Sequence, residues 1–311
     1  MAEIVFVHGI ANEQLGADML ESAWRAQLAG GMRVAGHRDL ADRVVRDRSA
    51  PEALDARMAF YGYLFLERGQ QGADTGELGA EAQALAAEWL RNVAERSRDA
   101  EERDEASRAI ASSSTEDVAQ GTGAVAGGLI RGLTRVSWFA DPIFGATAFV
   151  HKALRQVTRY LQDPHIRPKA QELVLDLIGP ETRVIIAHSL GTVVAWEALH
   201  RRPASLPLFL TLGSPLGLRH VIYDKLWPHP PTFPPGVERW VNVADRDDFI
   251  ASEPNLAKLF PRSKGAIGQF DGTWTVDNGA SPHNAEFYLG KEMIGEAVAR
   301  AFHGWRPKGT G

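Results

Sequence analysis

The chain has 311 residues, of which 44% are hydrophobic and 23% charged, and its formal net charge is −5. This composition can build one large core, or a core with a smaller appendage, and it lacks the basic surplus of a protein that coats nucleic acid. The absence of cysteine excludes disulfides, thiolate metal sites and a cysteine nucleophile.

The cellular compartment is suggested by the lack of recognisable targeting segments. The first apolar run, residues 4–7, ends at His8-Gly9 and is too short for the apolar region of a signal peptide. The longest apolar stretch, 121–150, is interrupted by Arg131, Arg135 and Asp141, and a membrane-spanning helix needs about 20 mostly apolar residues. We therefore expect a soluble, cytoplasmic protein.

Strand and helix patterns alternate along the chain. Short runs rich in β-branched and aromatic residues predict strands at 4–7, 57–61, 184–187, 208–212 and 238–243, and a last strand or a hairpin at 266–276. Apolar residues at helical spacing predict helices at 12–28, 77–108, 138–160, 169–178, 192–200 and 286–302. Such alternation favours an α/β fold with a mostly parallel sheet and helices on both faces.

One connection is far longer than a crossover requires. About 120 residues separate the second predicted strand from the third, whereas loops in α/β units usually have about 2 to 6 residues. We therefore predict a core formed by 1–63 and 166–311, with a helical insertion at 64–165. The Ser-rich 111–115 and Gly-rich 121–128 segments predict loops, the latter a hinge.

The insertion has two interpretations. It could form a cap or lid over a site, or a helical hairpin packed on the core. In a cap, its large apolar residues could contact an acyl chain or the surface of a membrane; these are Trp138, Phe139, Ile143, Phe144 and Phe149.

The most informative segment is Ala187-His188-Ser189-Leu190-Gly191, between a predicted strand and a predicted helix. Small residues at 187 and 191 permit a sharp turn that holds the serine in a strained backbone conformation. The segment resembles the nucleophile elbow of the α/β-hydrolases, with alanine in the place of the commoner first glycine. The resemblance implies that Ser189 is the nucleophile and that the Leu190 N–H stabilises an oxyanion.

The first strand ends in a second motif of this kind. Val7-His8-Gly9-Ile10 resembles the turn that follows an early strand in these enzymes, and it implies a second oxyanion donor at the Ile10 N–H. Gly9, together with His188 and Leu216, is also a candidate for contact with substrate. His8 and His188 are interpreted as residues that orient and pack these loops rather than as bases.

The triad acid and base should follow Ser189 in the order acid, then histidine. After the strand at 238–243, the resemblance favours Asp248 as the acid, with Asp245 in the turn as the alternative. His283, before the last helix, is the favoured base; the alternatives are His303, His220 and His229. Ser214, in a Gly-Ser-Pro turn, is a weak second candidate for the nucleophile.

Together these motifs resemble lipase-like and inositol-deacylase-like serine esterases of the α/β-hydrolase superfamily, over residues 4–61 and 174–302 but not over the insertion. The resemblance implies hydrolysis of a lipid-like or small-molecule carboxylic ester through an acyl-enzyme, with no cofactor and no metal. The same triad would also serve a thioesterase, an amidase or peptidase, or an acyltransferase, and the fold could carry a catalytically silent binding or effector protein.

Overall fold

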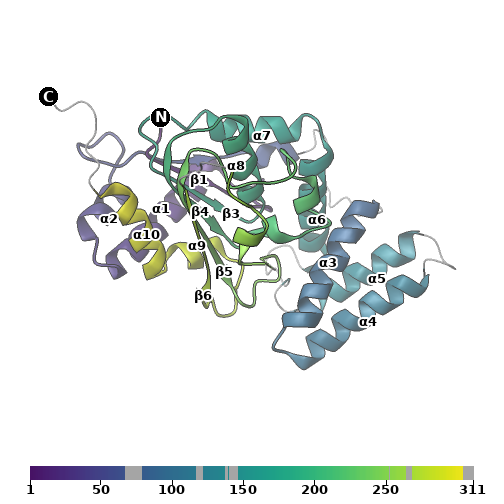
Figure 1. The fold of residues 1–311 in the computed structure, drawn as a ribbon. Helices are drawn as coiled ribbons and strands as arrows, with labels where there is room; N and C mark the ends of the chain where they lie inside the picture. The colour runs from purple at the N-terminus through teal and green to yellow at the C-terminus, as the bar shows by residue number, and fades with distance from the viewer. Residues whose placement is uncertain are drawn as a thin grey trace.

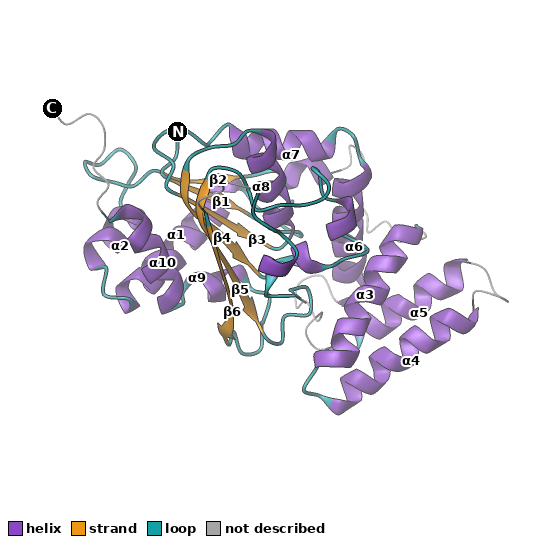
Figure 2. Cartoon of the chain, viewed as in Figure 1, coloured by secondary structure: helices purple, strands orange, loops and turns teal. Residues whose placement is uncertain are grey.

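A six-stranded parallel sheet forms the centre of the molecule (Figures 1 and 2). The computed structural model describes residues 1–66, 79–116, 122–136, 139, 146–251, 253–263 and 268–303. The strands are β1 (Ile4–Val7), β2 (Ala56–Ala59), β3 (Val184–His188), β4 (Leu206–Leu212), β5 (Val237–Asp245) and β6 (Gln269–Val276). All of the predicted strands are present.

The strand order is β2-β1-β3-β4-β5-β6, and it makes β1 and β3 the point where the chain reverses its direction across the sheet. The chain runs outward from β1 to β2 and then crosses back to β3 on the other side of β1. Ligands of open parallel sheets bind at the carboxyl ends of the strands beside such a switch point. The segments that start at His8 and Ser189 leave the sheet at this place.

Alternate residues of the strands contribute to two separate cores. Val5 and Val7 of β1 belong to one core, whereas Ile4 and Phe6 belong to the other. All four are fully buried, as expected for a strand covered on both faces. The sheet therefore has helices on both sides, in agreement with the sequence pattern.

The helices of the two faces come from different parts of the chain (Figure 1). One face is covered by α1 (Ala17–Val34), α2 (Arg38–Val45), α9 (Ala285–Leu289) and α10 (Glu292–Phe302). The other is covered by α7 (Ile166–Leu175) and α8 (Leu190–Arg201). Short 3-10 turns follow β2 and β4, at Gly62–Phe65, Pro215–Gly217 and Tyr223–Lys225, and Leu256–Lys258 forms another.

Four α-helices lie in the described part of the segment between β2 and α7. They are α3 (Ala80–Arg96), α4 (Ala100–Glu116), α5 (Thr122–Thr134) and α6 (Ala146–Gln162). Figure 2 shows α3, α4 and α5 side by side, projecting away from the sheet, whereas α6 lies near α7 on the body of the protein. One helix of this segment, α6, therefore packs on the body of the protein.

Three local predictions for this segment were wrong. The helix predicted at 77–108 is interrupted at Ser97, whose hydroxyl accepts a bond from the Asp99 N–H (3.1 Å), so that α3 and α4 are separate. The Ser-rich residues 111–115 are helical, and the Ser112 hydroxyl donates to the Ala109 carbonyl one turn earlier. Most of the Gly-rich hinge predicted at 121–128 lies in α5.

Helices α4 and α5 pack closely at a further glycine of α5. A Cβ on Gly132 of α5 would lie 2.5 Å from the Cβ of Ala109 on α4, so that only glycine permits this approach. Of the large apolar residues between 138 and 144, the structure describes one. Phe139 is buried and stacks on Trp89 of α3 at 5.7 Å, while Trp138, Ile143 and Phe144 lie outside the described residues.

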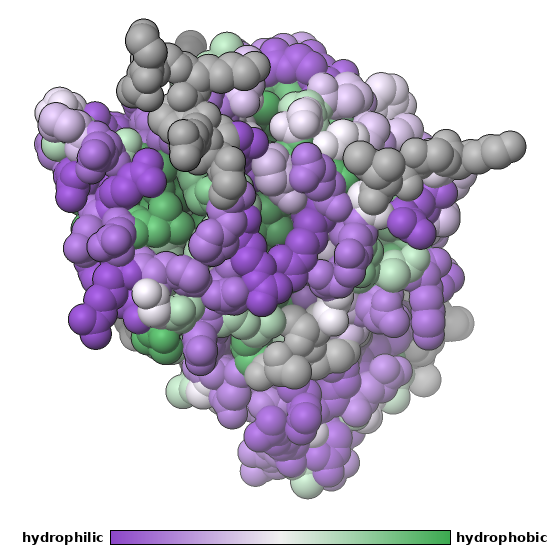
Figure 3. Space-filling view, turned by 60° about the vertical axis from the view of Figure 1, so that its left-hand side comes forward, coloured by the Kyte–Doolittle hydropathy of each residue, from purple (hydrophilic) through white to green (hydrophobic). Residues whose placement is uncertain are grey.

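The surface is mixed in polarity. On the face in Figure 3, hydrophilic residues predominate and hydrophobic residues show between them in separate patches. Among the described helices, none combines the length and the apolar character needed to cross a bilayer.

A buried carboxylate on α8 connects this helix to α6 and α7. Glu197 of α8 is fully buried and forms an ion pair with Arg167 of α7. It also accepts hydrogen bonds from the Tyr160 hydroxyl of α6 (2.6 Å) and from Gln171 (2.9 Å). Burial, together with the negative charge of Glu197, raises the pKa of Tyr160 well above its ordinary value, so that this hydroxyl remains a donor.

Replacement of Glu197 by glutamine should destabilise the fold by about 3 kcal/mol, because Arg167 would keep its charge in a largely buried position without a counterion. Chemical denaturation would measure this loss. Glu172→Gln is the matched control, since Glu172 on α7 pairs with Arg201 at the surface, where an ion pair contributes about 0 to 1 kcal/mol. Equal losses in the two variants would contradict the prediction.

Candidate active site

Ser189 occupies a sharp turn between β3 and α8. Its φ of 53° and ψ of −130° lie in a region that L-residues rarely adopt. The backbone is held there from both sides, since the Ser189 N–H donates to the Leu212 carbonyl (3.1 Å) and the Ser189 carbonyl accepts from the Thr192 hydroxyl (2.7 Å). The side chain makes no capping bond to α8, so its hydroxyl is not used to stabilise the helix.

Two glycines permit the close approach of neighbouring segments to this turn. The sheet register pairs Val7 with Ala187, so that Gly9 and Ser189 leave the sheet together. A Cβ on Gly9 would lie 2.7 Å from the Cβ of Ser189. A Cβ on Gly191 would lie 2.4 Å from the carbonyl oxygen of Val7. Both positions therefore require glycine, for a reason that depends on the fold rather than on the local turn.

The backbone strain at Ser189 predicts a difference in stability between two variants of this residue. The Ser189→Gly variant should be more stable than Ser189→Ala by about 1 kcal/mol or more, because glycine adopts this conformation without the Cβ penalty. The comparison between the two variants is clean, since neither retains the hydroxyl. Denaturant titration would measure the difference, and equal or lower stability of the glycine variant would show that the turn is unstrained.

His283 and Asp248 are brought together from two loops at the same edge of the sheet. The His283 Nδ1 donates to the Asp248 Oδ2 at 2.7 Å. Asp248 is fully buried, and the side chain of His283 is 14% exposed. The pair lies over Gly213, where a Cβ would be 3.0 Å from the His283 Nδ1. Because Gly213 follows Leu212, whose carbonyl binds the Ser189 N–H, the pair is adjacent to the serine turn.

Asp248 is held by further bonds that the sequence did not reveal. The Tyr288 hydroxyl donates to the same Oδ2 at 2.9 Å, and the Ile250 N–H donates to Oδ1 at 3.1 Å. Burial, and then the charge of Asp248, raises the pKa of Tyr288 well above its ordinary value, which keeps its proton in place. The only signal in the sequence is that Tyr288 lies one helical turn beyond His283.

Asp245, the alternative acid, has a different position. Its carboxylate accepts from the backbone N–H groups of Asp247 (2.8 Å) and Asn278 (2.5 Å). It therefore connects the turn that carries Asp248 to the loop that carries His283, as expected for an aspartate that caps a turn. The Asn278 side chain in turn donates to the Pro282 carbonyl at 3.0 Å, next to His283.

His188 contacts the candidate base through its backbone. The His188 Nε2 donates to the His283 carbonyl oxygen at 2.7 Å, and the two rings lie 4.5 Å apart. Burial, and then the nearby His283, lowers the pKa of His188 well below its ordinary value, so this imidazole is neutral. The contact agrees with the interpretation of His188 as a hydrogen-bonding residue.

His8 organises the loop that contains Gly9 and Ile10. The Tyr61 N–H donates to the His8 Nε2 at 3.1 Å, so Nδ1 carries the proton and donates to the Gly9 carbonyl at 2.7 Å. The Tyr61 ring also stacks on the imidazole at 4.2 Å. Complete burial lowers the pKa of His8 to about 4.

This depressed pKa predicts that stability depends on pH. In the unfolded chain His8 binds a proton near pH 6.5 but in the fold only near pH 4, so stability is lost as pH falls through this window and is unaffected above it. Between pH 7.5 and 5, His8 should account for about 2 kcal/mol of the loss. The His8→Gln variant, which keeps an acceptor for Tyr61, should lack this part in urea titrations. Equal losses in the two proteins would contradict the assignment.

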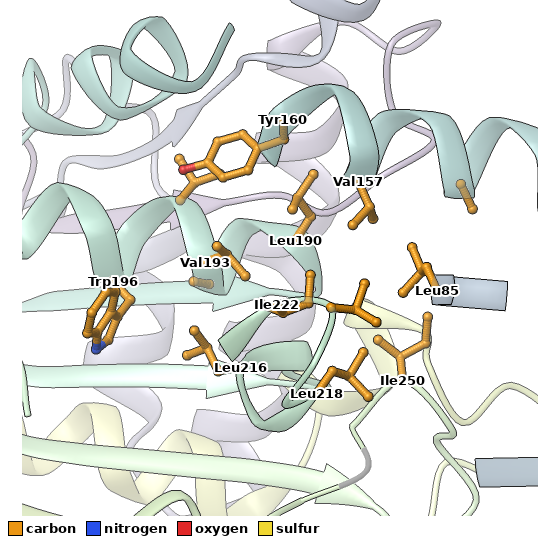
Figure 4. Packing of buried hydrophobic residues seen from close by; sticks show 14 of the residues in the cluster. Leu85, Val157, Tyr160, Leu190, Val193, Trp196, Leu216, Leu218, Ile222 and Ile250 are labelled. Carbon is orange, nitrogen blue, oxygen red and sulfur yellow. The ribbon is translucent and has the colours of Figure 1, made fainter. Parts of the chain in front are cut away.

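Leu216, a candidate for contact with substrate, and Ser214, the second candidate nucleophile, are both buried. Leu216 lies in the 3-10 turn after β4 and packs with Leu190 and Val193 of α8 (Figure 4). Ser214 is also buried; its hydroxyl accepts from the Leu216 N–H at 3.3 Å and lies 2.8 Å from the Thr192 hydroxyl, as expected for a turn residue.

Helices α3 and α6 contribute side chains to the core cluster that contains the first turn of α8. Leu85 of α3 and Val157 of α6 belong to the same core cluster as Leu190, Ile222 and Ile250, as Figure 4 shows. Ser189 is only 2% exposed. Helix α3 also binds the loop of the candidate acid, since the Asn92 amide donates to the Phe249 carbonyl at 2.9 Å. A substrate therefore reaches Ser189 only if some of these side chains move.

A polar cleft of about 210 Å³ opens next to the acid and histidine loops. It lies between the turn that joins α3 to α4 and the two loops, and its lining includes Arg98, Asp247 and Pro282. Within the described residues, no group of three or more histidine and acidic side chains is placed to hold a metal ion.

No family model, curated protein or solved structure matches this chain. Its function must therefore be argued from the geometry of the site.

Proposed function

We propose that the protein is a serine hydrolase of the α/β-hydrolase type, which cleaves carboxylic esters through an acyl-enzyme intermediate. The observation that carries the proposal is the backbone of Ser189, held at a φ of 53° at the amino end of α8, beside a buried Asp248–His283 pair. A strained serine between strand and helix exposes its Oγ to a base, whereas an ordinary turn has no need of this conformation.

The architecture supports the same proposal. The α/β-hydrolase fold places its nucleophile after a central parallel strand, and here Ser189 follows β3 at the switch point of the sheet. The acid follows β5, and the histidine precedes α9, so the order Ser189, Asp248, His283 along the chain is that of the superfamily.

The residues have complementary roles in the proposed reaction. Asp248 accepts a hydrogen bond from the Nδ1–H of His283, so that Nε2 is the basic nitrogen that takes the proton of the Ser189 hydroxyl. The serine Oγ then attacks the ester carbonyl, and the negative charge develops on the carbonyl oxygen. The proton passes from His283 to the leaving alkoxide, and the alcohol departs. Water, activated by the same imidazole, releases the acid and regenerates Ser189.

The oxyanion is stabilised by backbone N–H groups in this proposal. Leu190 is the first residue of α8, where N–H groups lack partners within the helix and the helix dipole favours negative charge. Ile10 provides the second N–H, from the loop that Gly9 brings against the Ser189 side chain.

A hydrophobic ester is the favoured substrate. The first turn of α8 belongs to an apolar core cluster that also includes residues of α3, α6 and the loops after β4 and β5; its members include Leu85, Val157, Leu190, Leu216, Leu218, Ile222 and Ile250 (Figure 4). These residues offer an acyl chain contacts in place of water, and they offer no charged group to a polar acyl part. We propose that α3 and α6 act as a cap whose displacement admits the substrate.

A fluorophosphonate probe should label wild-type protein at Ser189, and the protein should hydrolyse nitrophenyl esters of medium-length acids. Ser189→Ala and His283→Ala should each lower kcat by about 10⁴-fold or more, and Asp248→Asn by about 10⁴-fold, because the imidazole tautomer is then no longer fixed. Mass spectrometry would locate the label, and steady-state kinetics would measure the losses.

The control for this experiment is Ser214→Ala. Ser214 is a buried serine in the same region with its hydroxyl used in a turn, so its variant should still be labelled and active. An unlabelled but folded wild-type protein, or full activity in Ser189→Ala, would overturn the proposed function. Parallel assays with thioesters, amides and acyl acceptors would identify which bond is cleaved.

A further inference from the structure

Helix α6 contacts the loop that contains Ile10 through one buried amide. The Ala11 N–H donates to the Gln156 Oε1 at 2.8 Å. Gln156 is 5% exposed, although it lies in the 64–165 segment, outside the part of the chain that carries the recognised motifs. Its other end donates through Nε2 to the Glu13 Oε2 at 2.7 Å.

A second residue of α6 completes the contact. Lys152, one helical turn before Gln156, forms an ion pair with the Glu13 Oε1 at 2.7 Å. Glu13 is 8% exposed, so its carboxylate is desolvated and held by two groups from one helix face. The loop from Ala11 to Glu13 is therefore attached to α6 at two successive points.

The attachment coincides with a strained residue. Ala11 has a φ of 63°, in the left-handed region that favours glycine. A non-glycine residue remains in this region only where neighbouring groups hold it, and the bond from its N–H to Gln156 does so directly.

The peptide between Gly9 and Ile10, one residue before the peptide that Gln156 binds, carries the N–H that would bind the oxyanion. The Gly9 carbonyl accepts from the His8 Nδ1 (2.7 Å) and from the Asn12 amide (3.2 Å). The Asn12 amide also donates to the Ile10 carbonyl at 2.9 Å. Because a trans peptide directs its N–H opposite to its carbonyl, these bonds fix the direction of the Ile10 N–H.

We propose that Gln156 is a positioning residue for the oxyanion hole, so that α6 has to be in contact with the 8–13 loop for the Ile10 N–H to be in place. This inference rests on the proposed function. In this proposal the 64–165 insertion both covers the site and positions a group that stabilises the transition state. Displacement of α6 releases the Ala11 N–H, and its return restores the loop around a bound ester.

The Gln156→Met variant preserves side-chain length and removes both hydrogen bonds. Its kcat, per active site titrated with fluorophosphonate, should fall about 10- to 100-fold while KM changes less than about twofold, since the Ile10 N–H acts in the transition state. The Ki of a trifluoromethyl ketone that carries the same acyl chain should rise in the same ratio as kcat/KM falls.

Two further variants separate positioning from stability. Gln171→Met removes an equally buried glutamine of α7, which bonds Glu197, and should lower thermal stability but not kcat. The exchange Glu13→Gln with Gln156→Glu restores a donor–acceptor pair and an acceptor for Ala11, and should recover kcat to within about fivefold of wild type.

Hydrogen–deuterium exchange tests the inference without any activity. Residues 8–13 should exchange faster in Gln156→Met than in wild type, while residues 184–200 should be unchanged. Faster exchange in a protein that hydrolyses no ester would retain the positioning role of Gln156 and reject the proposed function. Unchanged exchange of 8–13, or an unchanged kcat in an active enzyme, would overturn the inference.

Discussion

The left-handed backbone of Ser189 is the constraint around which the carboxyl edge of the sheet is arranged. This conformation persists because bonds from Leu212 and Thr192 hold the turn and because Gly9 and Gly191 leave room for it. Such a conformation costs about 1–3 kcal/mol, and strained residues of this kind are concentrated at functional sites. The neighbouring Asp248–His283 pair gives the Ser189 side chain a use in the function that we propose.

Three buried, neutral side chains orient the loops near Ser189: His8, His188 and Tyr288. His8 and His188 have pKa values below the ordinary range because burial penalises the charged imidazole, and Tyr288 keeps its proton for the corresponding reason. Each therefore has a fixed set of donors and acceptors. A network of this kind holds the Asp248 carboxylate and the 8–13 loop in one arrangement, which electrostatic stabilisation of a transition state requires.

The helices of the 64–165 segment have two structural roles. Helices α4 and α5 pack against α3 and against each other, whereas α3 and α6 contact the loops of the candidate site. Tyr160 and Gln156, four residues apart on α6, bond α8 through Glu197 and the Ile10 loop through Ala11. Movement of α6 would therefore affect access to Ser189 and the geometry around it together.

The amino-acid sequence alone determined the six strands, their parallel arrangement and the segment with Ser189, because these depend on short apolar runs and on local turn chemistry. It favoured Asp248 over Asp245 through strand context, and the structure brings Asp248 and His283 within 2.7 Å. It did not predict the helical structure of the small residues at 111–116 and 122–128, which lie in α4 and α5, two helices that pack against each other. The contacts of Tyr288 and Gln156 were likewise decided by the tertiary structure. Glutamine and tyrosine have no local signature, and these two reach their partners across 40 and 145 residues of chain.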